Sequence, residues 1–240
     1  AFFLKDPIKT IDLNYIGMKS VLESALRHSP KVKILYLSSA ETYGSPTEGN
    51  FPTPETYPGW NSVENNRACY VESKRLAEVL CLSYARMHNM HVRAARLALA
   101  YGPGMTMDDA RVISQFISKA HKDKVIKMVD DGRDLRCFCY MSDVLRELIH
   151  ILLFARETIY NVGSSAEEIS ILDLAKIIGK LMSVEVLPGP GKDFALIGAP
   201  TRVCLDLTRV EKEFGIKPLV RMEEGLKRTI DWNLAILAGN

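Results

Sequence analysis

The chain has 240 residues, of which 47% are hydrophobic and 25% are charged, and its formal net charge is +2. This length suits one large α/β domain, or one domain with a smaller appendage. Basic and acidic residues are interspersed, which argues against a nucleic-acid partner, because nucleic-acid-binding proteins usually carry a clustered basic face. No apolar run reaches the roughly 20 residues that a membrane span requires, so no membrane partner is expected.

The first part of the chain alternates between helical and strand patterns. Asp6 followed by Pro7 predicts a helix start, and the helix is expected to end near residues 28–30. Short apolar runs at 32–37 and 92–99 are typical of parallel strands that are covered on both faces, and helical spacing occupies 70–88 between them. This order favours a parallel sheet with crossover helices.

The pattern is looser in the rest of the chain. Two short strands are expected on either side of an Asp131-Gly132 turn. The elements expected in this part are helices at 110–122, 142–155, 171–182, 207–214 and 222–237, and strands at 125–129, 136–140, 158–162 and 184–187.

The cysteines do not form a recognisable framework. Cys137 and Cys139 lie on one face of a predicted strand, but their C-x-C spacing differs from the C-x-x-C of a redox pair. No second Cys/His pair follows nearby to complete a zinc site. Reduced, buried thiols are therefore expected, which fits a reducing, cytoplasmic location. The five cysteines are Cys69, Cys81, Cys137, Cys139 and Cys204.

The glycines do not include a G-x-G-x-x-G sequence. Gly102 and Gly104 follow a predicted strand, but Met107 occupies the third position. A dinucleotide site needs this turn so that the backbone and a helix N-terminus can approach the pyrophosphate. The chain also begins in a helical pattern, with no βαβ unit ahead of it. Either the chain is part of a longer protein, or much of a cofactor site has been lost.

Tyr70 and Lys74 are one helical turn apart, so both side chains emerge on one face. A lysine ammonium favours the phenolate form of a nearby tyrosine, which then becomes a base, and it can also hold a ribose hydroxyl. A surface pair with the same spacing is the alternative. Ser39 ends the strand upstream, where ligands bind in parallel sheets, and a serine there can polarise a substrate hydroxyl.

Several motifs occur in an order that resembles the extended short-chain dehydrogenase/reductase family. They are LSSAETYG, YVESK, ARLALAYGPG, RCFCYMSD and YNVG. The segment YGPGMTMDDARVISQFISKA is most similar to UDP-glucuronate decarboxylases and capsule-type nucleotide-sugar epimerases.

This resemblance implies catalytic roles for four residues and a nicotinamide cofactor, NAD. Ser39 falls at the catalytic Ser or Thr, Tyr70 at the base, and Lys74 at the residue that binds the nicotinamide ribose. Glu41 matches a glutamate that decarboxylases and dehydratases use near the sugar. The alternatives are a strand-end hydroxyl that caps backbone groups for Ser39 and a solvated loop acid for Glu41.

The resemblance also implies substrate contacts. Arg136 and Arg202 match arginines that clamp a nucleotide diphosphate, a task that suits the planar donor fork of arginine. Arg111 falls in the segment that lines the nucleotide pocket. A surface role is the alternative for Arg111 and Arg202. Asp143 matches an interdomain position, and we interpret it as structural.

The implied fold is a Rossmann-like, doubly wound parallel α/β sheet that lacks its first βαβ units, roughly 60–90 residues at about 30 per unit. Residues 1–103 would form the remainder of the NAD-binding domain with the catalytic residues. Residues 104–240 would form mainly a smaller α/β region that binds a nucleotide sugar, with UDP as the expected nucleotide, and some segments would return to the first domain.

Three alternatives for the function stay open. The first is decarboxylation of UDP-glucuronate through a 4-keto intermediate, and the second is 4-epimerisation, whose pattern Ala40 resembles. The third is a catalytically inactive remnant that binds nucleotide sugar or dimerises. Leu99 stands where the family has a substrate-contacting Asn, so that contact is lost or remade. The family also implies a homodimer through helices at 6–27 and 70–88.

Overall fold

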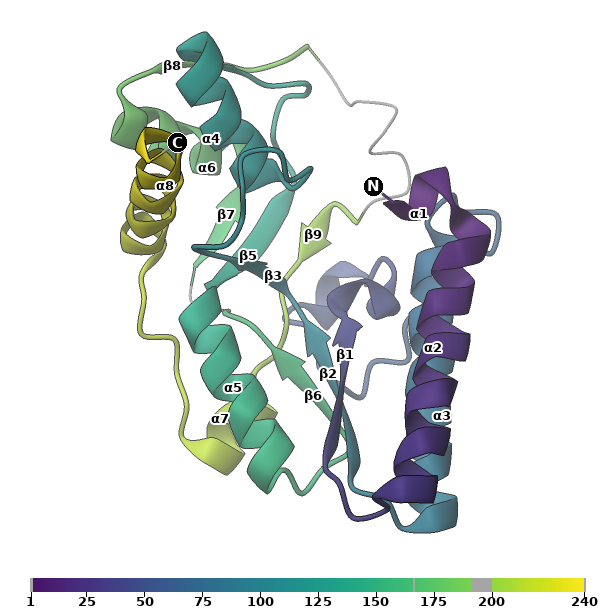
Figure 1. Cartoon of the computed structure of the whole chain (residues 1–240). Helices are drawn as coiled ribbons and strands as arrows, with labels where there is room; N and C mark the ends of the chain where they lie inside the picture. The colour runs from purple at the N-terminus through teal and green to yellow at the C-terminus, as the bar shows by residue number, and fades with distance from the viewer. Residues whose placement is uncertain (1, 166, 191–199, 240) are drawn as a thin grey trace.

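The computed structural model describes residues 2–165, 167–190 and 200–239 (Figure 1). A three-stranded parallel sheet in the order β1-β2-β6 lies in the lower half, with two helices on each face (Figure 1). This arrangement confirms the predicted α/β class with a parallel sheet. The strands are β1 (Ile34–Ser39), β2 (Val92–Leu97) and β6 (Ile159–Val162), and the helices are α2 (Pro7–His28) and α3 (Ala68–His88) on one face, with α5 (Met141–Phe154) and α7 (Thr208–Phe214) on the other.

Successive strand residues pack into different cores, as a sheet that is covered on both faces requires. Val92 and Ala94 pack with Leu22 of α2 and Ala77 of α3. Ala95, the next residue along β2, packs into the core beneath α5 and α7. The apolar runs seen in the sequence therefore serve two cores at once.

Helix α2 begins and ends where predicted. The Asp6 carboxylate accepts a hydrogen bond from the Lys9 backbone N–H at 3.0 Å, and Pro7 occupies the first helical position. A short helix that was not predicted, α1 (Phe2–Lys5), precedes it. Within the described residues, no helix is long and apolar enough to cross a membrane.

A second, mixed sheet surrounds β5, which pairs parallel with β3 and β9 and antiparallel with β7. The prediction of one strand over 92–99 was wrong, because β2 ends at Leu97 and a new strand begins at Leu99. Between them the Ala98 N–H still donates to the Val162 carbonyl at 2.8 Å, and the chain then crosses to β5. The strands are β3 (Leu99–Tyr101), β5 (Leu135–Tyr140), β7 (Glu168–Ser170) and β9 (Arg202–Val203).

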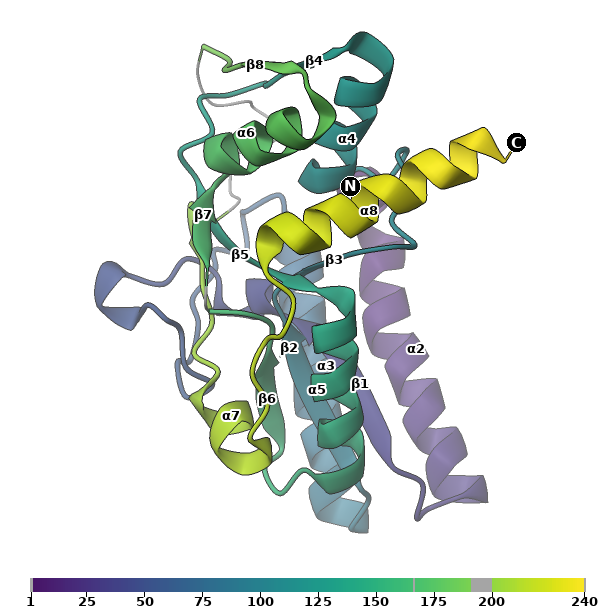
Figure 2. The same ribbon diagram turned by 90° about the vertical axis from the view of Figure 1, so that its left-hand side faces the viewer.

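The third part of the fold lies beyond this sheet, at the upper end in Figure 2, and has a core of its own. Its fully buried residues include Ile117, Ile126 and Leu226. The five helices predicted after residue 104 are all present, to within two residues. The elements of this part are α4 (Val112–Asp123), α6 (Ile171–Met182), α8 (Met222–Ala238), β4 (Val125–Lys127) and β8 (Glu185–Leu187).

The two strands that flank the Asp131-Gly132 turn exist, but they pair with different partners. β4 pairs parallel with β8, and β5 belongs to the mixed sheet. Gly132 has φ +69°, and its carbonyl accepts a hydrogen bond from the Leu172 N–H at 3.0 Å. The turn therefore packs against the start of α6 and does not close a hairpin.

Glu147 of α5 is a buried acid whose side chain reaches the end of β6. It is 1% exposed and accepts a hydrogen bond from the Gly163 N–H at 2.9 Å. Burial nevertheless raises the pKa of this carboxyl group from 4.5 to about 8. The folded chain therefore holds this proton over a pH range in which the unfolded chain has lost it.

We predict that this group makes the free energy of unfolding decrease by roughly 3 to 4 kcal/mol between pH 5 and pH 8, because the folded state binds more protons there. Glu147→Gln, which keeps an acceptor for Gly163, should remove most of this decrease. Urea unfolding at several pH values measures it, with the exposed Glu64→Gln as control. An equal pH dependence in Glu147→Gln and the parent chain would contradict the assignment.

Candidate active site

The carboxyl end of β1 turns sharply into the 3-10 segment η1 (Ala40–Tyr43). The Ser39 Oγ caps this segment by accepting a hydrogen bond from the Glu41 N–H at 3.2 Å. Gly44 ends it with φ +66°, and a Cβ atom there would lie 1.7 Å from the Trp60 carbonyl oxygen. Only glycine fits this turn, so the local sequence presents Ser39 and Glu41 on a tightly constrained backbone.

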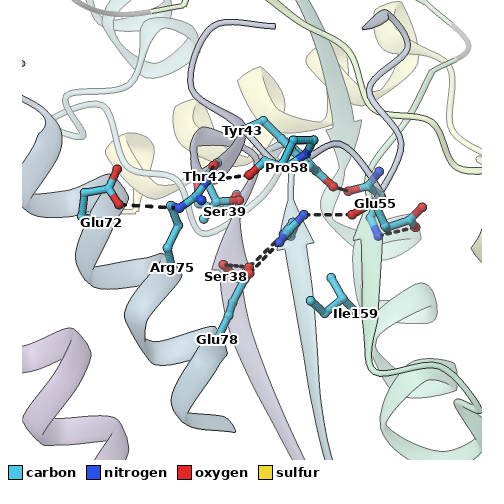
Figure 3. Close-up of polar contacts among 12 residues, drawn as sticks. Ser38, Ser39, Thr42, Tyr43, Glu55, Pro58, Glu72, Arg75, Glu78 and Ile159 are labelled. Carbon is cyan, nitrogen blue, oxygen red and sulfur yellow. Dashed lines mark hydrogen bonds and ion pairs between the residues drawn. The ribbon is translucent and has the colours of Figure 1, made fainter. Parts of the chain in front are cut away.

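A buried polar network holds this turn against helix α3 (Figure 3). The Glu78 carboxylate accepts hydrogen bonds from Ser38 Oγ at 2.6 Å and from Arg96 Nε and Nη2 at 2.9 and 2.7 Å. The Arg96 guanidinium lies 4.6 Å from the centre of the Tyr43 ring, and the Tyr43 hydroxyl donates to Asn161 at 2.7 Å. The last residue of η1 is thereby tied to β2 and β6.

Arg75 of α3 holds the same turn from the other side. Figure 3 shows it reaching the backbone of Thr42 and Pro58, and its Nη1 atom donates to both carbonyl oxygens at 2.9 Å. Helix α3 therefore anchors the turn and also carries Tyr70 and Lys74 one helical turn apart, so the positions of these groups are coupled.

Tyr70 lies in the first turn of α3, near enough to Ser39 for this side chain to influence the Tyr70 pKa. Burial raises the pKa of Tyr70 above its ordinary value of 10.0, although interaction with the Ser39 side chain lowers it. Of the neighbouring charges, Glu41 raises this pKa and Arg67 lowers it. The structure thus brings Ser39, Glu41 and Tyr70 together.

Lys74 lies beside this group, and its Nζ atom donates to the Leu37 carbonyl oxygen at 2.9 Å. It is 5.9 Å from the Tyr70 ring centre and 4.9 Å from that of Tyr36, and burial lowers its pKa. Burial is the largest influence on the Tyr70 pKa, and Arg67 is a cation that lowers it.

The polar groups around Lys74 fit a ribose. A lysine ammonium has three N–H donors, and the bond to Leu37 uses one of them. Within the described residues, the buried Tyr36 hydroxyl has no hydrogen-bond partner. Together with the Tyr70 hydroxyl, these groups offer donors and acceptors for a diol at the carboxyl end of β1.

Sequence reasoning missed Arg67. Its guanidinium forms two hydrogen bonds with the Glu41 carboxylate, one of them 3.0 Å between Nε and Oε2. It also lies 4.7 Å from the centre of the Phe3 ring, which stacks on Tyr70 at 5.3 Å. The sequence feature that could have indicated Arg67 is its position three residues before Tyr70, a spacing that places both side chains on one side of a helix.

Of the three predicted substrate arginines, Arg136 is one whose pKa is influenced by charges of this site. It is largely buried in β5, and burial lowers its pKa, while the charges of Glu41 and Arg67 also act on it. Its guanidinium donates to the Pro200 carbonyl at 2.7 Å and to Asp134 at 3.2 Å.

The other two predicted arginines are bound to carboxylates elsewhere. Arg202 of β9 pairs with Glu168 at 2.7 Å and with Glu48 at 3.0 Å. Arg111, at the start of α4, pairs with Asp109 at 2.7 Å. The contacts described for these two side chains do not run to Ser39, Tyr70 or Lys74.

Asp143, interpreted as structural, accepts hydrogen bonds from the backbone N–H groups of Leu219 and Val220 at 2.9 and 3.0 Å. These contacts join the start of α5 to the segment that leads into α8. Leu99 packs against the core of the third part of the fold.

Solved structures of nucleotide-sugar enzymes share this fold. The UDP-glucose 4-epimerase of Thermotoga maritima, solved with UDP-glucose, superposes with a TM-score of 0.87 at 24% identity, covering 99% of this chain and 74% of its own. The dTDP-glucose 4,6-dehydratase of Bacillus anthracis, solved with NAD, gives a TM-score of 0.79 at 23% identity, over 94% of this chain and 68% of its own. They confirm the predicted Rossmann-like α/β fold.

Relatives by sequence are named UDP-glucuronic acid decarboxylases. Decarboxylase 5 of Arabidopsis thaliana is 32% identical over 231 residues, which is 94% of this chain and 64% of the relative. Decarboxylase 1 of Xenopus tropicalis is 32% identical over 234 residues, or 96% of this chain and 53% of the relative. The chain therefore spans between about half and two thirds of the length of these relatives.

Residues 3–163 match the NAD dependent epimerase/dehydratase family. This match covers more than half of the chain, and its range contains the strand that ends at Ser39 and the helix that carries Tyr70. It agrees with the resemblance inferred from the ordered motifs, and the chain belongs to the NAD dependent epimerase/dehydratase family.

Proposed function

We propose that the protein containing this chain converts a nucleotide sugar through a 4-keto intermediate and that its reaction is the decarboxylation of UDP-glucuronic acid. The observation that carries the proposal is the gathering of Ser39, Glu41 and Tyr70 at the carboxyl end of β1, where Ser39 and Glu41 both act on the Tyr70 pKa. Relatives that are 32% identical and are named UDP-glucuronic acid decarboxylases support the substrate.

In this proposal Tyr70 acts as the base. Bound NAD supplies the hydride acceptor for the oxidation of a sugar hydroxyl. Ser39 orients that hydroxyl, and the Tyr70 oxygen takes its proton. Because burial raises the pKa of Tyr70, the nearby cationic charge of Arg67 is needed to make the phenolate accessible at neutral pH. Lys74 uses one N–H donor for the Leu37 carbonyl oxygen and would hold the nicotinamide ribose with its other N–H donors.

A ketone at C4 is placed β to the carboxylate of a uronic acid, so carbon dioxide can leave while the ketone accepts the electron pair. C5 would then take up a proton, and return of the hydride from the cofactor to C4 would give the UDP-pentose. Glu41 would act next to the reacting sugar, and its bond to Arg67 keeps it in a fixed position. Arg136 would contact the diphosphate after exchanging its bond to the Pro200 carbonyl. Arg111 and Arg202 would have to leave carboxylate partners to do so.

Epimerisation at C4 is the second candidate, and Ala40 favours it because it matches the epimerase pattern next to Glu41. The two reactions differ in their products. Decarboxylation of UDP-glucuronic acid releases carbon dioxide and a UDP-pentose, whereas epimerisation yields an isomer of unchanged mass.

We predict that Tyr70→Phe lowers kcat about 10²- to 10⁴-fold, because the phenyl ring cannot take up the substrate proton. Product formation from UDP-glucuronic acid, followed by NMR with NAD supplied, measures this in the protein that contains the chain. Tyr84→Phe makes the same change later on α3 and should leave kcat unchanged. Undiminished turnover in Tyr70→Phe would refute the role of base.

We predict that Arg67→Gln shifts the acidic limb of the pH–rate profile to higher pH. The variant removes the cation that lowers the Tyr70 pKa, while burial and Glu41 continue to raise it. The base is then deprotonated only at higher pH, and kcat at neutral pH falls. The exposed Arg86→Gln, on the same helix, is the control. An acidic limb that stays in place or moves to lower pH would contradict this reading.

We also propose that two copies associate through α2 and α3. These helices pack side by side at one edge of the molecule, where Asn14 Nδ2 donates to Ser73 Oγ at 3.0 Å (Figure 1). Their outer surfaces carry exposed apolar side chains, including Ile8 at 69%, Ile16 at 52% and Val79 at 59%. Such a surface favours association with a second apolar surface.

We predict that Val79→Glu converts a dimer into a monomer, because a charge would be buried in the contact. Light scattering after size-exclusion chromatography measures the mass. Leu219→Glu, at an exposed apolar position outside these helices, should leave the dimer intact. A monomeric parent protein, or a dimeric Val79→Glu variant, would refute the contact.

A further inference from the structure

Two buried thiols lie side by side in the mixed sheet, although 67 residues separate them in the chain. Arg136 of β5 pairs with Val203 of β9, and the next residues in the same register are Cys137 and Cys204. Their sulfur atoms are 3.0 Å apart, and the residues are 0% and 5% exposed.

We propose that Cys137 and Cys204 are an oxidation site that forms a disulfide bond on reaction with a peroxide. Neighbouring positions on paired strands lie about 5 Å apart at the Cα atoms, within the range that a disulfide spans. The sulfur atoms need to approach by only about 1 Å to reach bonding distance.

The two thiols differ in pKa, and this difference indicates which of them reacts first with the peroxide. The Cys137 S–H donates a hydrogen bond to Cys204 Sγ, and this bond lowers the pKa of Cys204 and raises that of Cys137. Burial raises the Cys204 pKa, as do Glu168 and Asp206, whereas the Arg202 guanidinium lowers it. Cys204 is therefore the thiol that more readily becomes the nucleophilic thiolate.

The chemistry balances with hydrogen peroxide as the oxidant. The Cys204 thiolate attacks one peroxide oxygen and the O–O bond breaks, which forms a sulfenic acid on Cys204. The departing hydroxide takes up a proton and becomes the first water. The Cys137 sulfur then attacks the Cys204 sulfur, the S–O bond breaks, and the hydroxide leaves as a second water with the proton of Cys137. Two thiols are oxidised to one disulfide, and one peroxide is reduced to two waters.

A metal site is the competing use of the same residues. Glu168 lies opposite Cys137 on β7, and its carboxylate is within 4.8 Å of both sulfur atoms. Tetrahedral zinc with Zn–S bonds of about 2.3 Å would hold two sulfurs about 3.8 Å apart, farther than their 3.0 Å separation. The Glu168 carboxylate is also bound by two Arg202 nitrogens, at 2.7 and 2.9 Å. These contacts favour the disulfide.

The disulfide would join β9 to β5 between two candidate substrate arginines. Arg136 directly precedes Cys137, and Arg202 lies two residues before Cys204. Oxidation would therefore fix the lateral spacing of the two strands that carry these side chains.

The experiment is peptide mapping of the protein that contains this chain, after treatment with hydrogen peroxide and alkylation of the remaining thiols under denaturing conditions. We expect two of the five thiols to be lost and one cross-linked peptide pair, containing Cys137 and Cys204, that dithiothreitol releases. Cys137→Ser and Cys204→Ser should each lack it. Cys139→Ser removes another buried thiol of β5 and should retain it.

The map of the parent chain decides the question even where a serine variant fails to fold, which circular dichroism would reveal. Three results would overturn the proposal. They are a map without the cross-linked pair, a pair formed by other cysteines, and one equivalent of zinc in the purified chain that both serine variants lose.

Discussion

The ion pair between Glu78 and Arg96 is the contact on which the candidate site depends. It joins helix α3 to strand β2 in the protein interior, and the same carboxylate binds Ser38 at the end of β1. Removing one partner of a buried pair typically costs about 3–5 kcal/mol, because the other charge is left uncompensated. Here it would also release the turn that carries Ser39 and Glu41 from the helix that carries Tyr70.

Burial and charge oppose each other at Tyr70, and their balance sets what the site can do. Burial favours the neutral phenol, while the Ser39 side chain and Arg67 favour the phenolate. Arg67 also binds Glu41, so one guanidinium controls both the position of an acid and the proton affinity of the base. A site arranged in this way responds to changes in its charged neighbours, as active sites commonly do.

Much of the fold could be predicted because periodicity is a local property. The cap at Asp6, the helix at 171–182 and the apolar runs of β1 and β2 are each determined by residues within a few positions of one another. The partners of β4 and β5 could not be predicted, since strand pairing depends on where distant segments pack. Strands as short as β9 leave too few residues to show a pattern.

By itself the sequence determined the α/β class, the place of Ser39 at a strand end, and Tyr70 and Lys74 on one helix face. It also established the ordered motifs of the family. Only the tertiary structure decided that Arg67 binds Glu41, that burial raises the Tyr70 pKa, and that Cys137 meets Cys204. The physical reason is that these contacts join residues 26 to 67 positions apart, and desolvation exists only once the chain is packed.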